Sequence, residues 1–176
     1  MATAALFETY ESAGATFDEP ARVYRYSLHR MWGGGNLSCW RTVLWIMLNP
    51  STADEHKLDP TLRKCQAFTR AWGFDGFEVC NLFALRSTDP KALYRHPEPV
   101  GPLNDAAILT AAGRADRIVC GWGRHGKLHG RNRTVLGSLL RAGHQPKRLG
   151  VLNVDGSPRH PLYLPYRIEM YPLESA

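Results

Sequence analysis

Apolar and polar positions in the first part of the chain predict two strands. Residues 22–32 alternate roughly between apolar and polar side chains, and residues 33–36 are a turn sequence with three glycines. Residues 37–48 give the second strand, so the pattern predicts a β-hairpin. This second strand closes with the apolar run 43–48, which is typical of a central strand covered on both faces.

Helical and strand-like segments alternate in the rest of the chain. Asp59 as an N-cap and Pro60 at the first helical position begin a helix that Gly73 ends. The later segments are strand 77–85, helix 104–112, strand 116–121, helix 131–141 and strand 148–154. The order β-β-α-β-α-β-α-β predicts an α/β fold of three layers, α/β/α, with a mostly parallel central sheet.

The length of 176 residues is that of one domain. We expect residues 1–21, with weak periodicity and small side chains, to be an N-terminal arm and residues 22–176 to be a single α/β domain. The four cysteines include no Cys-x-x-Cys pair, so they indicate free thiols in a reducing compartment. Without a signal peptide or an apolar run long enough to span a membrane, the sequence predicts a cytoplasmic protein.

The chain is basic, with 22 Lys and Arg against 16 Asp and Glu and a net charge of +6. Such a charge indicates a polyanionic partner, for which nucleic acid is the common choice, or a basic protein without one. Basic residues are densest within residues 124–133, where they can hold a phosphate backbone or form a solvated face.

Polar side chains gather where four predicted strands end, and open α/β sheets bind ligands at the carboxyl ends of their strands. Asn49 can orient a water or read a base edge, or bond the backbone beside Pro50. Asp54 can activate water or cap a turn, whereas Asp59 is better explained as an N-cap. Asn81 interrupts an apolar strand and must be hydrogen-bonded, either to a ligand or between loops.

Three further residues near these ends are candidates. His160, between two prolines, can stabilise a developing oxyanion or be a surface histidine in a rigid turn. Phe83 and Trp122 can offer stacking faces to a base or pack in the core. The candidate contacts to DNA are Ser51, Arg86, Ser87, Arg124, Lys127, Arg131 and Arg159, with Leu162 as a wedge in the base stack.

Several of these residues belong to a set of motifs that resembles an uncharacterised bacterial and phage domain family over roughly residues 22–172. The motifs are residues 47–54, Asp59-Pro60-Thr61, Trp72-Gly73, residues 81–86, Asn104-Asp105, Trp122-Gly123 and His160-Pro161-Leu162-Tyr163. The layout also resembles the uracil-DNA glycosylase superfamily. Asn49-Pro50 is similar to the water-positioning motif of its mismatch-type members, Asn81 to their base-reading asparagine, and His160-Pro161-Leu162 to their last loop.

The resemblance implies a uracil-DNA glycosylase-like fold and a mechanism. DNA would bind the basic face, and a damaged or modified base, for example a modified pyrimidine in phage DNA, would be flipped into the pocket. Asn81, with Phe83 or Trp122, would hold the base, Asn49 or Asp54 would position water, and His160 would stabilise the leaving base. No metal, organic cofactor or obligate protein partner is implied. The alternatives are an enzyme acting on free nucleosides or nucleotides and a non-catalytic module that binds a modified base.

Overall fold

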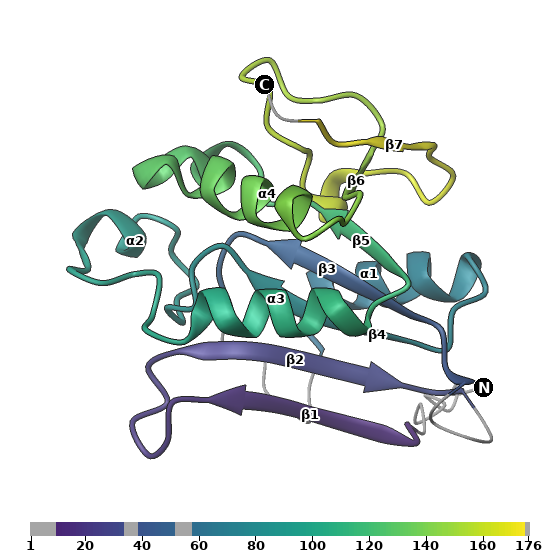
Figure 1. The fold of residues 1–176 in the computed structure, drawn as a ribbon, viewed down its shortest axis with the longest axis horizontal. Helices are drawn as coiled ribbons and strands as arrows, with labels where there is room; N and C mark the ends of the chain where they lie inside the picture. Colours follow the sequence, from purple (N-terminus) through teal and green to yellow (C-terminus); the bar gives the residue numbers. More distant parts are fainter. Residues whose placement is uncertain (1–9, 34–38, 52–57, 175–176) are drawn as a thin grey trace, which may run out of the picture.

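The part of the chain that the structure describes, residues 10–33, 39–51 and 58–174 of a computed structural model, forms a seven-stranded mixed sheet with helices on both faces (Figure 1). Across the sheet the strands are β1 (Ser12–Phe17), β2 (Arg25–Met31), β4 (Gly76–Asn81), β3 (Thr42–Met47), β5 (Arg117–Cys120), β6 (Lys147–Leu149) and β7 (Met170–Pro172). The helices are α1 (Pro60–Ala71), α2 (Ala92–Arg95), α3 (Asn104–Arg114) and α4 (Arg131–Arg141), with the 3-10 helices η2 (Arg124–Gly130) and η3 (Pro161–Tyr163).

The four central strands, β4, β3, β5 and β6, are parallel to one another. The pairings of β1 with β2, β2 with β4 and β6 with β7 are antiparallel. The expected mostly parallel sheet is therefore wrong for the sheet as a whole, because half of these six pairings are antiparallel. Only the centre, where helices connect successive strands, follows the expectation.

The predicted hairpin between residues 22–32 and 37–48 does not form. β2 pairs with β1 and β4, whereas β3 pairs in parallel with β4 and β5. β1 falls inside the N-terminal arm expected over residues 1–21, so part of that segment belongs to the sheet. Its small residues lie partly exposed at the sheet edge and give no apolar alternation, which explains why the sequence pattern concealed it.

Strand β3 divides the core into two parts. Leu44 and Ile46 pack with residues of α3 and α4 on one face, whereas Trp45 packs with residues of α1 on the other. Trp45 is fully buried, and its Nε1–H donates to Thr69 Oγ1 at 3.1 Å. The apolar run 43–48 is thus the strand covered on both faces that its composition predicts.

Helix α1 confirms the helix predicted from Asp59 and Pro60. The Leu62 N–H donates to Asp59 Oδ1 at 2.8 Å, so Asp59 is the N-cap, and Pro60 is the first helical residue. The helices predicted over residues 104–112 and 131–141 are α3 and α4. In the described part of the chain, every helix is too short or too polar to cross a membrane.

Candidate functional site

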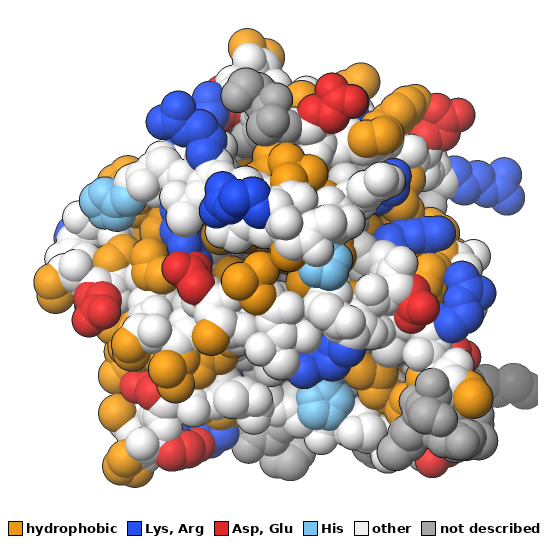
Figure 2. Space-filling model, in the orientation of Figure 1, with side chains coloured by type: hydrophobic (Ala, Val, Ile, Leu, Met, Phe, Trp, Pro, Cys, Tyr) orange, Lys and Arg blue, Asp and Glu red, His pale blue; other side chains and the backbone are white. Residues whose placement is uncertain are grey.

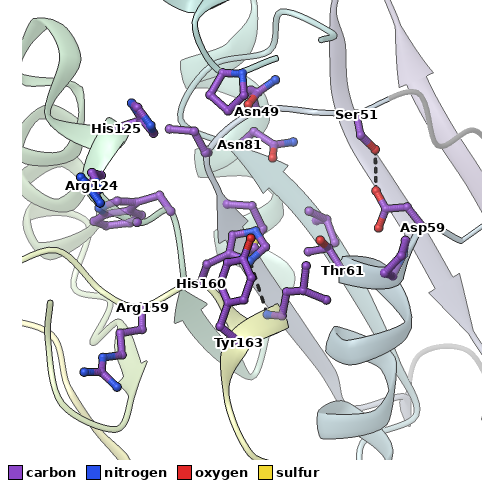
Figure 3. A pocket seen from close by; sticks show the side chains of 18 of the residues that line it. Asn49, Ser51, Asp59, Thr61, Asn81, Arg124, His125, Arg159, His160 and Tyr163 are labelled. Carbon is purple, nitrogen blue, oxygen red and sulfur yellow. Dashed lines mark hydrogen bonds between the residues drawn. The ribbon is translucent and has the colours of Figure 1, made fainter. Parts of the chain in front are cut away.

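A cavity of about 1150 Å³ opens where the central parallel strands end. The chain leaves β3 towards α1 on one face of the sheet and leaves β5 towards α4 on the other face. Neighbouring parallel strands whose connections diverge in this way leave a crevice at their carboxyl ends, which is where open α/β sheets bind ligands. Side chains that follow β3, β4, β5 and β6 line the same space, together with the start of α1 (Figure 3).

Backbone hydrogen bonds hold these strand ends together. Leu82 N–H donates to Met47 O at 2.9 Å, and Gly123 N–H donates to Pro158 O at 3.0 Å. At Gly121, an added Cβ would lie 2.8 Å from Pro161 Cδ. Glycine therefore lets the loop before η3 approach the end of β5 closely, and this loop forms one wall of the cavity.

Asn49 follows β3 and lies half-buried in the cavity wall. Its Nδ2 donates to Ser87 O at 2.8 Å and to Pro50 O at 3.2 Å, with Leu85 O at 3.5 Å. Carbonyl oxygens can only accept, so they fix the amide with its nitrogen towards the backbone. Oδ1 is then the atom of Asn49 that can accept a hydrogen bond from a water or ligand.

Asn81, the last residue of β4, is 1% exposed and lines the cavity. Its position is set by the register with β3, where it is paired with Met47. The buried Nδ2 of Asn81 finds no hydrogen-bond acceptor among the described residues. Since an unsatisfied buried amide costs about 1–3 kcal/mol, this group indicates that a ligand supplies the acceptor.

His160 caps η3 and faces the same cavity. The Leu162 N–H donates to His160 Nδ1 at 3.4 Å, so the neutral ring carries its proton on Nε2. Burial lowers the pKa of His160 below its ordinary value of 6.5, and the negative charge of Asp59 opposes this shift. The ring is therefore neutral at pH 7 and can donate from Nε2.

Asp59 lines the cavity as well as capping α1. Ser51 Oγ donates to Asp59 Oδ2 at 2.5 Å, which joins the segment after β3 to the start of the helix. Arg25, at the start of β2, is buried in the same wall; burial lowers its pKa to about 10, which still leaves it charged at pH 7, and Asp59 again opposes the shift. Asp54, the other carboxylate expected here, lies outside the described residues.

Residues 25–162 match the model of a family described as "Protein of unknown function (DUF1643)". The chain belongs to this family. No curated protein and no solved structure matches the chain significantly. These comparisons bring no link to the uracil-DNA glycosylase superfamily, which remains a resemblance between motifs.

The DUF1643 chain brings most of the predicted site residues together. Those that line the cavity are Asn49, Ser51, Asn81, Ser87, Trp122, Arg124, Arg159, His160 and Leu162. Trp122 is buried and packs beneath Gly126, where an added Cβ would lie 2.3 Å from its Cδ1. Arg124 and Arg159 are exposed at the rim.

Phe83 and Arg131 are not in the cavity, so their predicted roles as base and DNA contacts are wrong. Phe83 is fully buried among core residues on the face of α3 and α4. Arg131 is 5% exposed, and its Nε donates to Leu82 O at 2.7 Å while its guanidinium pairs with Asp105. Both residues stabilise the wall of the site from behind.

Two more predicted DNA contacts lie elsewhere. Arg86 donates to Arg22 O at 2.9 Å and lies over the ring of Phe17, so it ties the loop after β4 to the β1–β2 connection. Lys127 is exposed and donates to Asp155 O, beside the cavity but outside its lining. Neither geometry supports the predicted phosphate contact.

Sequence reasoning missed Arg25 and the role of Asn104. Arg25 reads as an ordinary residue of an alternating strand, so no signal identified it. Asn104 is fully buried, and its Nδ2 donates to Asn81 O at 2.9 Å and to Leu82 O at 3.0 Å. Its place in the motif Asn104-Asp105 was the available signal, because Asp105 holds Arg131, which bonds the same Leu82 carbonyl.

Proposed function

We propose that this chain is a DNA glycosylase that accepts a flipped, modified or damaged base and hydrolyses its N-glycosidic bond. The observation that carries the proposal is the buried Nδ2 of Asn81, which lines a cavity and lacks an acceptor among the described residues. The edges of nucleobases carry ring nitrogen and carbonyl acceptors that such a group can read. The cavity is large enough for a nucleotide.

Bond cleavage would use two groups with fixed orientations. The glycosidic bond would break with its electron pair passing to the base nitrogen, leaving an oxocarbenium-like sugar, as in the hydrolysis of O-glycosides. His160, donating from Nε2, would stabilise the negative charge on the leaving base. Asn49 Oδ1 would orient the water that adds to C1′, and the proton of that water would leave to solvent.

The rim of the cavity supports DNA as the substrate. Arg124 and Arg159 are exposed there, and Leu162 lies between the cavity and solvent. On the face seen in Figure 2, Lys and Arg are interspersed with Asp, Glu and apolar side chains. Phosphate contacts are therefore assigned to the arginines at the rim rather than to a continuous basic surface.

The second candidate function is a non-catalytic module that binds a modified base. It is favoured by the chemistry of Asn49, because an amide can orient water but cannot remove its proton. Both candidates use Asn81 to read the base, so they differ only in whether the base is released.

The test is incubation of the protein with uracil-containing, damaged and phage-modified duplex DNA, followed by alkali to reveal abasic sites. We expect release of one class of base, with loss of release in Asn81→Ala and His160→Ala. Asn132→Ala, in α4 and outside the cavity lining, is the matched control that should keep full activity. Binding of a modified duplex without release of a base would refute the glycosylase and support the non-catalytic binding module. No binding at all would refute both functions.

A further inference from the structure

Two carboxylates line the cavity among the described residues, Asp59 and Asp155, and they differ in how they are held. Asp155 is exposed and accepts from Ser157 Oγ at 2.6 Å within its own turn. Asp59 is half-buried and bridges two separate segments of the chain. Only Asp59 is therefore fixed in place by the core of the fold.

The hydrogen bonds of Asp59 fix its orientation. Oδ1 accepts from the Leu62 N–H at 2.8 Å, and Oδ2 accepts from Ser51 Oγ at 2.5 Å. Both oxygens of a carboxylate accept hydrogen bonds, and each keeps a second lone pair for a further partner. In Figure 3, Asp59 lies on the α1 side of the cavity and His160 on the η3 side.

The charge of Asp59 acts across this space. It favours the protonated form of His160 and the charged form of Arg25, both of which line the cavity. A fixed negative charge facing a partly apolar cavity keeps more of its effect than one in open water. Such a charge stabilises positive charge that develops beside it, without any rearrangement during the reaction.

We propose that Asp59 is a catalytic residue of base release, whose carboxylate contacts the sugar of the flipped nucleotide and stabilises the positive charge that develops on C1′ and O4′. The inference rests on the proposed glycosylase activity. Asp59 forms no covalent bond and takes no proton. The glycosidic electron pair leaves with the base, water adds to C1′, and its proton passes to solvent. Asn49 carries no charge, so it cannot fill this role.

The test uses variants that keep the helix cap and remove the charge. Asparagine and serine both cap helices well, so Asp59→Asn and Asp59→Ser should fold with α1 intact. We expect each to slow base release by about 100-fold or more, the size of a lost electrostatic contact to a transition state. Affinity for the same DNA should change little. Asp116→Asn is the matched control, since Asp116 also accepts a backbone N–H, from Thr42 at 2.7 Å, at the other end of the sheet.

A second readout needs no substrate. Among the described residues, the charged groups that line the cavity with His160 are Arg25, Asp59, Arg124, Asp155 and Arg159. Because the charge of Asp59 raises the pKa of His160, NMR titration should give a lower pKa in Asp59→Asn and an unchanged one in Asp116→Asn. An unchanged pKa in Asp59→Asn would contradict the electrostatic argument.

The outcomes separate the inference from the function on which it rests. If the wild type releases a base and Asp59→Asn does so at the same rate, Asp59 is a helix cap alone and the inference is overturned while the glycosylase stands. If the wild type releases no base from any of the DNA substrates, both are overturned.

Discussion

Replacing Asn104 by alanine should weaken the wall of the cavity from behind. Asn104 is fully buried at the start of α3 and does not line the cavity. Its amide nitrogen donates to the carbonyls of Asn81 and Leu82 at 2.9 and 3.0 Å, and these two bonds anchor the end of β4. The substitution therefore tests whether this anchor, rather than direct contact, holds Asn81 in place.

The loss of stability in Asn104→Ala depends on which hydrogen bonds the two carbonyls keep. The Leu82 carbonyl retains a donor, because Arg131 Nε lies 2.7 Å away, whereas the Asn81 carbonyl loses its bond to the amide. Loss of Oδ1 of Asn104, which has no partner among the described residues, offsets part of the cost. Two bonds at about 1 kcal/mol each, with this offset and the extra cost of the cavity that alanine leaves, give about 1.5–3 kcal/mol. In a domain of this size the melting temperature should fall by roughly 3–12 °C.

A second variant sharpens the test. In Asn104→Asp an ionised carboxylate would face two carbonyl oxygens, so at pH 7 it should be less stable than Asn104→Ala. The difference in stability between the two variants should be smaller at pH 5, because a protonated carboxyl can donate to a carbonyl. Thermal unfolding monitored by circular dichroism measures the stability of both variants at both pH values. The control Asn132→Ala is expected to stay within about 0.5 kcal/mol of the wild type. A melting temperature of Asn104→Ala within about 1 °C of the wild type would refute the inference that Asn104 holds the end of β4 in place.

Three further predictions concern the basic rim, the core and pH. Arg131→Met should lower the melting temperature but leave the salt dependence of DNA binding unchanged. In binding titrations, Arg124→Ala should reduce the slope of log affinity against log salt concentration by about 1. Thr69→Val should cost about 1–3 kcal/mol in urea unfolding, because the buried Trp45 Nε1–H loses its acceptor. Because burial lowers the pKa of His160, the unfolded chain binds its proton more readily, so stability should fall as pH drops below about 6.5, and less so in His160→Gln.

The site was more predictable than the sheet. Asn49, Asn81, Trp122 and His160 lie at or beyond the ends of central strands. Parallel strands bring their carboxyl ends to one edge, so the sequence alone placed these residues together. The edge strand β1 gave no signal, because small, half-exposed residues need no apolar alternation. The pattern of apolar and polar positions identifies buried central strands well and edge strands poorly.

Charge and apolar character could not show which way a side chain points. Arg131 stands in a dense basic stretch that reads as a nucleic-acid surface, yet it is buried with a carbonyl and Asp105 as partners. Phe83 lies two residues beyond Asn81, and the strand predicted to reach residue 85 ends at Asn81. Beyond that point the strand alternation no longer applies, so the direction of Phe83 depended on a loop that the sequence pattern could not resolve.

The geometry of Asn49 limits what the cavity can do to a water. Backbone carbonyls hold its nitrogen, so only Oδ1 is available, and an amide oxygen does not take a proton at neutral pH. A reaction that needs a strong nucleophile before the bond breaks would be poorly served by such a group. A reaction in which the bond breaks first would need only an oriented water, a donor to the leaving base and a fixed negative charge beside the sugar. In the proposed mechanism Asn49, His160 and Asp59 supply these three groups, so the proposed glycosylase would break the glycosidic bond before water adds to the sugar.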